Sequence, residues 1–207
     1  PFLSPNDDFA DFETWDTGNL DFSAAKTPDM LAGEYARSAL KRGLTLEAET
    51  GANPYRFGMI GSSDIHTSLS TPDEDNFFGK TPPDEPSPGR ATHIAKQNED
   101  LGLVRFGWEY ATPGLAAVWA KENSRAAIFD AMMRKETYAT TGTRIRVRFF
   151  GGWDFEGEDA LGRDLAMVGY SKGVPMGGDL SPGEGAPSFL VYALRDAMGA
   201  NLDRIQI

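Results

Sequence analysis

The chain has 207 residues, of which 40% are hydrophobic and 25% are charged, proportions typical of a soluble globular protein with one large or two small domains. Its 20 basic and 31 acidic residues give a formal net charge of −11, which argues against binding to nucleic acid or to an anionic membrane surface, since both require a basic footprint. The absence of cysteine excludes disulfides and thiolate metal sites, and no apolar run approaches the ~20 residues that a membrane-spanning helix needs.

The first elements that the sequence predicts are an irregular acidic segment and a helix. Residues 1–26 mix acids with aromatic side chains, which is typical of a segment that lies over a core and not of a disordered tail. Thr27 and Pro28 predict a helix start, with threonine as the N-cap and proline at the first helical position. This helix ends near residue 43 or continues to Gly51, before Asn53-Pro54 breaks the chain.

A short buried strand is predicted over residues 55–61, followed by Asp64 and His66. Residues two apart on an extended chain point to the same side, so we expect Asp64 and His66 on one side and Ile65 on the other. A carboxylate and an imidazole at the end of a strand suit a divalent metal ion. The alternative for so short a pattern is an aspartate that caps the next turn and a histidine that packs.

Residues 68–100 predict a long loop, because they hold Pro72, Pro82, Pro83, Pro86 and Pro88. Such a loop is either a functional lid or an insertion. Its histidine, His93, is interpreted as a surface residue in preference to a ligand or proton donor. A strand over residues 103–108 then leads to Glu109, which could hold a metal or orient water, although a solvated or ion-paired glutamate is the simpler interpretation.

The next elements are a helix, a turn and a strand. Asn123 or Ser124 is expected to cap a helix that runs to about residue 136. The hydroxyl-rich stretch 138–142 is either a simple turn or an anion cradle built from backbone amides. The alternating stretch 144–149 predicts a strand with its aliphatic and aromatic residues inward.

Three arginines lie on the other side of that predicted strand: Arg144, Arg146 and Arg148. Guanidinium groups suit phosphate oxygens, so these side chains could bind an anionic substrate group. An exposed strand face that pairs with the many acids of the chain is the interpretation that we favour. From residue 151 glycine becomes frequent, helix signals vanish and strands are predicted at 188–194 and 203–207, so a β-rich domain is expected to begin near residue 144.

The stretch Gly61-Ser62-Ser63-Asp64-Ile65-His66 resembles the last metal-binding motif of the polymerase and histidinol phosphatase (PHP) superfamily. Its wider context is more specific, because further blocks look like a large, mostly bacterial "domain of unknown function" family of PHP-like proteins. The blocks are Phe57–Thr67, Glu74–Lys80, Trp119-Ala120, Ala127–Met132, Tyr138–Gly142 and Val147–Asp154, and the resemblance covers essentially the whole chain.

The resemblance implies an α/β fold, in which residues 1–143 are the C-terminal part of a distorted (β/α)7 barrel and residues 144–207 begin a β-rich, sandwich-like region. It implies that Asp64 and His66 bind a divalent metal, Zn, Mn or Fe, with two or three ions in the intact protein. The implied activity is that of a phosphoesterase that uses metal-activated water on a small, phosphorylated substrate.

The histidine content departs from this family pattern. The chain holds only His66 and His93 and has no His-x-His motif, whereas a site of this type needs about twice as many histidines. We therefore expect that the N-terminal half of the barrel is missing, that the chain, which begins with Pro1, belongs to a longer protein, and that it is inactive alone. The alternative is a non-catalytic binding or structural module on a degenerate barrel. The compartment is not determined, and a periplasmic or secreted parent is compatible with the sequence.

Overall fold

A computed structural model describes residues 16–31, 33–69, 76–82, 85–110 and 114–207 of the chain. The chain divides into two compact units. Unit 1 comprises Pro1–Arg56, Ile65–Leu69 and Phe78–Ala111, and unit 2 comprises Phe57–Asp64, Ser70–Phe77 and Thr112–Ile207. The polypeptide therefore passes between the units more than once. The division near residue 144 that the sequence suggests stays a prediction.

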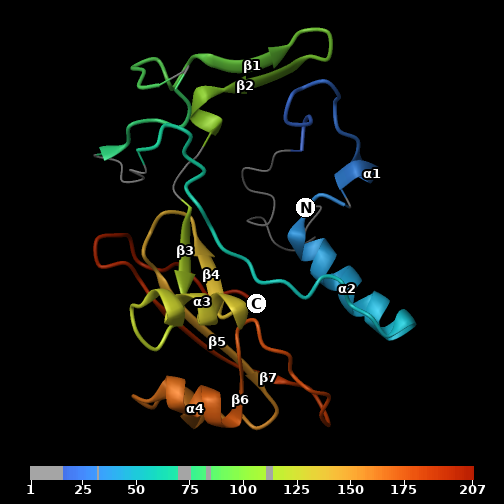
Figure 1. Cartoon of the computed structure of the whole chain (residues 1–207), viewed down its shortest axis with the longest axis vertical. Helices are drawn as coiled ribbons and strands as arrows, with labels where there is room; N and C mark the ends of the chain where they lie inside the picture. Colours follow the sequence, from blue (N-terminus) through green and yellow to red (C-terminus); the bar gives the residue numbers. More distant parts are fainter. Residues whose placement is uncertain (1–15, 32, 70–75, 83–84, 111–113) are drawn as a thin grey trace. The chain divides into compact units, whose positions relative to one another are not determined.

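Unit 1 combines short helices with one antiparallel hairpin (Figure 1). Its elements are α1 (Pro28–Leu31), α2 (Ala36–Thr50), β1 (Ile94–Asn98), β2 (Leu103–Phe106) and the 3-10 turn η2 (Gly107–Glu109). The predicted helix from residue 28 is thus divided into α1 and α2, and it follows the longer of the two expected courses. Gly51 ends it with a φ of 76°, which glycine adopts without strain, and its N–H donates to the Glu47 carbonyl at 2.9 Å.

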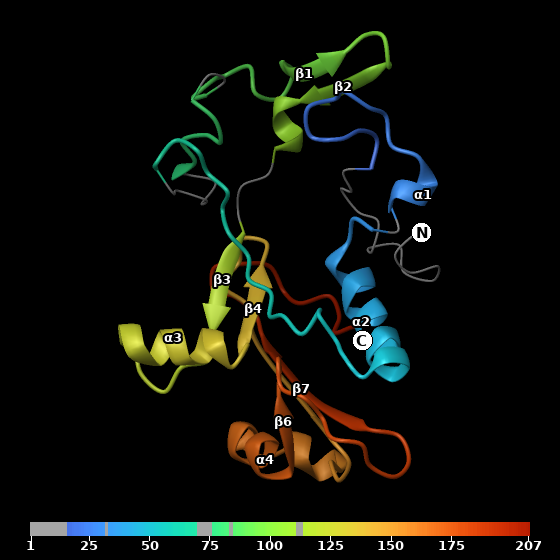
Figure 2. The ribbon, with the colours of Figure 1, turned by 45° about the vertical axis from the view of Figure 1, so that its right-hand side comes forward.

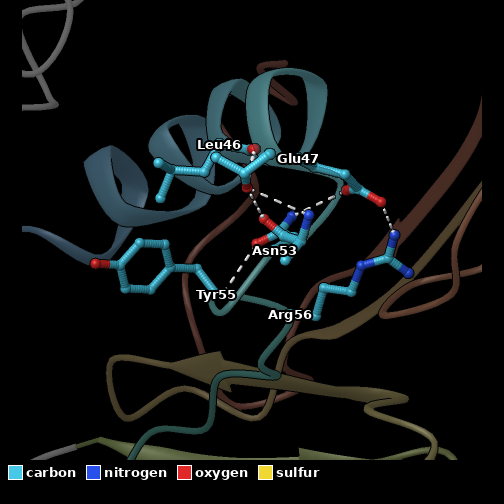
Figure 3. A network of polar contacts seen from close by, with 7 residues as sticks. Leu46, Glu47, Asn53, Tyr55 and Arg56 are labelled. Atoms are coloured by element: carbon cyan, nitrogen blue, oxygen red, sulfur yellow. Dashed lines mark hydrogen bonds and ion pairs between the residues drawn. The ribbon is translucent and has the colours of Figure 1, made fainter.

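A polar network fixes the chain that leaves α2 (Figure 3). Asn53 lies against Gly43, where an added Cβ would come within 2.3 Å of the asparagine Oδ1. The Asn53 side chain accepts from the Tyr55 N–H at 2.9 Å and donates to the Glu47 carboxylate at 3.3 Å. Arg56 pairs with the same carboxylate. The break that the sequence predicts at Asn53-Pro54 is therefore a fixed turn against α2.

The loop before α1 covers the hairpin in unit 1. Phe22 is 2% exposed, and its carbonyl accepts from the Asn98 side chain at 2.8 Å. The Arg105 guanidinium, on β2, lies 5.3 Å from the centroid of the Phe22 ring. Gly18 permits this packing, because a Cβ there would lie 2.8 Å from Leu103 Cδ1.

Unit 2 contains two antiparallel sheets (Figure 1). Its elements are β3 (Leu115–Val118), α3 (Arg125–Met133), β4 (Thr137–Thr140), β5 (Arg146–Gly152), the 3-10 turn η3 (Gly157–Ala160), α4 (Leu165–Lys172), β6 (Gly173–Pro175) and β7 (Ser188–Leu194). Strands β3 and β4 form one sheet, and the other has the order β6-β5-β7. The β5–β7 ladder is continuous, from Arg146 opposite Leu194 to Gly152 opposite Ser188.

The core of unit 2 lies between the larger sheet and α4, which runs beside β6 in both views (Figures 1 and 2). Phe150 and Leu190 are opposite each other on β5 and β7 and are 1% and 4% exposed. Gly169 lets α4 approach them, since a Cβ at this position would lie 2.5 Å from the Phe150 ring. The adjacent Tyr170 ring meets Phe150 edge to face, with 5.1 Å between the ring centroids.

The expected fold class is wrong. All the strand pairs in the described residues are antiparallel, the sheets have two or three strands, and no barrel closes among these residues. The fold is instead a small mixed one, with few helices and small antiparallel sheets. The resemblance behind the barrel prediction is carried by short sequence blocks, whereas a (β/α)7 barrel requires parallel pairing across long crossover connections.

Several local predictions also differ from the structure. Residues 55–61 form no strand, a helix (α4) lies where helix signals were not found, and residues 203–207 form no strand. The stretch 138–142 begins within β4. Other predictions are confirmed: Ser124 caps α3 by accepting from the Ala127 N–H at 3.3 Å, and β7 occupies residues 188–194.

Part of the sequence-based interpretation falls outside the described residues. This applies to the aromatic and acidic segment 1–15, to Pro72 and Pro83, and to Glu74 and Asp75 of the resembling block. Within the described residues, no helix has the length and apolar character needed to span a bilayer, and α2 has 15 residues.

Candidate functional site

The segment that precedes Asp64 lies against β3 and β4 within unit 2. The Met59 carbonyl accepts from the Thr137 hydroxyl at 3.0 Å. Gly61 approaches β3 so closely that a Cβ would lie 2.6 Å from the Leu115 carbonyl oxygen. The hydrogen bond at Met59 and the close approach of Gly61 fix the backbone of the segment, although it does not pair with a strand through backbone hydrogen bonds.

Asp64 and His66 are both exposed. Ser63, which precedes Asp64, and Ile65, which lies between the two, are half-buried. This alternation agrees with the expectation that Ile65 turns away. The backbone, however, is not extended, because Asp64 has a φ of 51° in the left-handed region. Aspartate is one of the few residues other than glycine that tolerate this region. The extended geometry from which we placed both side chains on one side is therefore absent at Asp64.

His66 is held from the other direction, within unit 1. Its N–H donates to the Lys80 carbonyl at 2.8 Å, and the Thr67 hydroxyl donates to the Gly79 carbonyl at 3.4 Å. The boundary between the units falls between Asp64 and Ile65. Each member of the predicted pair is thus anchored to a different unit.

A buried ion pair stabilises the loop to which His66 is bonded. Glu85 is 9% exposed, pairs with Arg90 and accepts from the Lys80 N–H. Arg90 also donates to the Tyr110 carbonyl at 2.6 Å. Burial lowers the pKa of the Arg90 guanidinium, but arginine remains charged at neutral pH. The carbonyl that receives the His66 N–H therefore belongs to a loop that a buried ion pair holds in place.

Two ligands alone would not complete the metal site that the sequence predicts at Asp64 and His66. Catalytic zinc sites use three protein ligands and leave one position for water. Among the described residues, no group of three or more histidine, aspartate and glutamate side chains is placed to hold a metal ion. Asp64 and His66 offer two suitable ligands, a carboxylate and an imidazole, and the described residues do not complete the set.

Glu109 and His93 have structural partners in unit 1. Glu109 lies in η2, and its carboxylate accepts from the Phe106 N–H at 2.6 Å, so it caps its own turn. The His93 ring packs on Gly107, where a Cβ would come within 2.3 Å of His93 Cε1. Its Nδ1 lies 3.3 Å from the Gly89 carbonyl, and its Nε2 is buried without a hydrogen-bond partner in the described residues. The catalytic role suggested for Glu109 stays a prediction.

The three arginines expected on one strand face separate in the structure. Strand β5 begins at Arg146, so Arg144 lies before it, and its N–H donates to the Asp196 carboxylate at 2.7 Å. Arg146 and Arg148 do share a face, but Phe150, the buried centre of the core, is on that same face. The arginine face was expected to point outward, and beyond Arg148 it points into the core.

The hydroxyl-rich stretch 138–142 contains an ordinary turn contact, in which the Thr140 hydroxyl accepts from the Gly142 N–H at 3.4 Å. Gly142 has a φ of 124°, which favours glycine. A simple turn is therefore present only at the end of the stretch, after β4.

A cluster around Glu136 was not foreseen from the sequence. Glu136 is 3% exposed, accepts from the Tyr170 hydroxyl and binds Arg134 at 3.1 Å. Arg148 donates to the Tyr170 hydroxyl at 3.2 Å and stacks on Trp119, with 3.6 Å from its guanidinium carbon to the ring centroid. Although Tyr170 is 48% exposed as a whole, burial of its hydroxyl region and the bond to Glu136 raise its pKa.

This cluster brings together residues from separate parts of unit 2, which explains why no local motif marks it. Glu136 follows α3, Arg148 is on β5 and Tyr170 is on α4. A weak signal does exist in the alternating arginines of β5, because an arginine on the face of a core residue needs a partner.

Comparisons with known proteins give one match. No curated protein and no solved structure matches the chain. A family model described as "Protein of unknown function (DUF3604)" matches residues 1–207. This agrees with the domain-of-unknown-function family that the sequence blocks resemble, and membership of the PHP superfamily is not shown. The chain belongs to the DUF3604 family.

Proposed function

We propose that the protein is a metal-dependent hydrolase of phosphate esters in which Asp64 and His66 are two of the metal ligands. The observation that supports this most directly is their exposure on a fixed backbone. The segment before Asp64 is held by Thr137, and the residue after Ile65 is held by Lys80, yet both side chains reach solvent. The remaining ligands would come from residues other than those that the structure describes.

The two residues offer complementary donors. The Asp64 carboxylate supplies an anionic oxygen, and the His66 imidazole supplies a nitrogen when it is neutral. A bound divalent ion would lower the pKa of a water molecule towards neutrality and stabilise the leaving oxygen of the ester. Because the His66 N–H is bonded to the Lys80 carbonyl, the chain itself restricts where the imidazole can reach.

Metal retention and turnover test this proposal together. The protein in its longest natural form is loaded with Zn, Mn or Fe, freed of excess metal and analysed for bound metal and for phosphomonoester hydrolysis. We expect Asp64→Ala and His66→Ala each to lower the metal content and to reduce turnover at least a hundredfold, since loss of a ligand disrupts the site. The matched controls are Asp100→Ala, an exposed turn residue, and His93→Gln, the second histidine. Unchanged metal content and turnover in both site variants would contradict the proposal.

The second candidate function is a non-catalytic binding module. It is favoured by the fact that the described residues hold no complete set of metal ligands. Elemental analysis of the purified chain distinguishes the two functions. Stoichiometric bound metal that is lost in Asp64→Ala contradicts the binding module. A protein that holds no metal but binds a ligand at another site favours the binding module.

A further inference from the structure

A hollow of about 440 Å³ lies in unit 2, beside the part of the larger sheet that holds Arg146, Arg148 and Tyr192. Arg146 and Arg148 of β5 and Tyr192 of β7 face it from the sheet, since Arg148 and Tyr192 are directly opposite and Arg146 is two residues away. The same sheet face continues to Phe150, where α4 covers it. The hollow is therefore the uncovered part of a face whose other part is core.

The charge of this hollow is opposite to that of the protein. Arg146, Arg148 and Arg163 line it, and none of its lining residues is an acid, although the chain carries a net charge of −11. Within the described residues, neither Arg146 nor Arg163 takes part in an ion pair, and the nearby Asp159 is bound by Lys172 at 2.9 Å. Two guanidinium groups thus lie at one hollow without a carboxylate between them.

The rest of the lining is aromatic and aliphatic. Arg148 stacks on Trp119, whose indole N–H donates to the Val147 carbonyl at 2.8 Å, so the ring and the guanidinium are held in fixed positions. Leu165 and Ala166, at the start of α4, provide an apolar wall. Clefts of a few hundred Å³ with an apolar lining and a few polar groups are typical of small-molecule sites.

We infer that this hollow binds a small organic anion, which carries a phosphate, sulfonate or carboxylate group on a planar apolar body. The guanidinium forks of Arg146 and Arg163 suit the oxygens of such a group, and the stacked surface of Trp119 and Arg148 suits the planar body. A long polyanion is disfavoured, because the net charge of −11 repels it outside the hollow. This site is separate in its residues from the proposed metal ligands.

The test measures binding by calorimetry to the metal-free chain, so that hydrolysis does not interfere. Phenylphosphonate, benzenesulfonate and benzoate carry both ligand features, inorganic phosphate lacks the planar body, and phenol lacks the charge. We expect at least one of the three aromatic anions to bind more tightly than inorganic phosphate or phenol. Binding of that anion should weaken as salt concentration rises.

Single-charge variants identify the site. Arg146→Gln and Arg163→Gln should each weaken binding about tenfold, since each removes a charge-assisted hydrogen bond. Arg144→Gln is the matched control, because it removes one charge beside the same strand but does not line the hollow. Thermal unfolding checks that all three variants fold. The inference is overturned if no aromatic anion binds, or if Arg144→Gln weakens binding as much as the two lining variants.

Discussion

The two units bury different kinds of side chain. In unit 1 the described buried residues other than glycine are one phenylalanine, Phe22, and the charged residues Lys80, Glu85 and Arg105. In unit 2 they are Ala131, Phe150 and Leu190, with Glu136 as the charged exception. Unit 2 is therefore organised by apolar packing on a regular ladder, whereas unit 1 depends on side chains that bond to the backbone of irregular segments.

Different interactions should therefore decide the stability of each unit. Removal of an apolar side chain lowers the free energy of unfolding in proportion to the volume removed. A buried charged group lowers this free energy when its partner is removed. The variants below test the contrast.

The largest effect is expected for Phe150→Ala in unit 2. Phe150 is 1% exposed and touches both Leu190 and α4, so its removal should lower the free energy of unfolding by about 3–5 kcal/mol. Urea unfolding measures the loss, and hydrogen exchange should locate it in β5, β7 and α4. Phe189→Ala is the matched control, because Phe189 is on the other sheet face and is 47% exposed. An equal loss in the control would show that the Phe150 side does not form the core.

The next effect is expected for Glu85→Gln in unit 1. The change leaves the Arg90 guanidinium without its buried carboxylate, and breaking such a pair costs about 3 kcal/mol when one partner is partly exposed. The described loop segments 76–82 and 85–93 should then become sensitive to limited proteolysis. Glu49→Gln removes the same charge from an exposed position on α2 and should have no such effect. If both variants resist protease equally, charge pairing does not organise unit 1.

A smaller effect is expected when Gly169 becomes alanine. The new methyl group would lie 2.5 Å from the Phe150 ring, and we expect a net loss of about 1–2 kcal/mol even though alanine is the better helix former. Gly157→Ala is the matched control, because a Cβ there meets no atom within 4 Å. Its thermal unfolding temperature should be unchanged. A stabilising Gly169→Ala would mean that α4 can move away from the sheet without cost.

The smallest effect is expected at Asp196, where the sign depends on pH. Hydrogen bonds from the N–H groups of Arg144 and Met198 lower the pKa of the Asp196 carboxylate. A carboxylate with a lowered pKa in the folded state stabilises the fold above its unfolded pKa of 3.8, and this contribution disappears as the pH falls through the folded value. Asp196→Asn should therefore lower the unfolding temperature at pH 7 and have a smaller effect at about pH 2. Scanning calorimetry at the two pH values measures this, and an equal difference at both would contradict it.

Local signals in the sequence predicted the parts of the fold that local chemistry determines. Ser124 could be identified as a cap because its hydroxyl bonds within the first turn of α3, and Gly51 as a helix end because it adopts a positive φ. The strand β7 could be found because residues 188–194 are a short apolar run, and its Leu190 is buried. Each of these features involves neighbours in the chain or a simple period.

Features that depend on distant contacts could not be predicted. Residues 55–61 look like a buried strand, but they bond to β4 through a side chain, with the Thr137 hydroxyl in place of a backbone partner. Helix α4 was missed because Gly169 weakens its helical pattern, and the need for glycine there comes from Phe150 on another strand. The barrel prediction came from the resemblance to PHP-like proteins, and the antiparallel pairing of the described strands overturned it.

The candidate site shows the same division. Asp64 and His66 could be selected because a carboxylate and an imidazole, both potential metal ligands, stand two residues apart in the sequence. The positive φ of Asp64 could not be anticipated, because it arises where the chain passes from one unit to the other. Neither could the Glu136 cluster, whose members are distant in the sequence and come together through contacts such as those of Tyr170 on α4 with Arg148 and Glu136.

The stacking of Arg148 on Trp119 gives the protein an internal optical reporter. The indole ring lies 3.6 Å from a guanidinium carbon, and its emission should respond when that cation moves. The chain has four tryptophans, so replacing the other three with phenylalanine would isolate this fluorescence signal. Occupancy of the arginine-lined hollow could then be followed in real time, by light alone, on a sample too dilute for calorimetry.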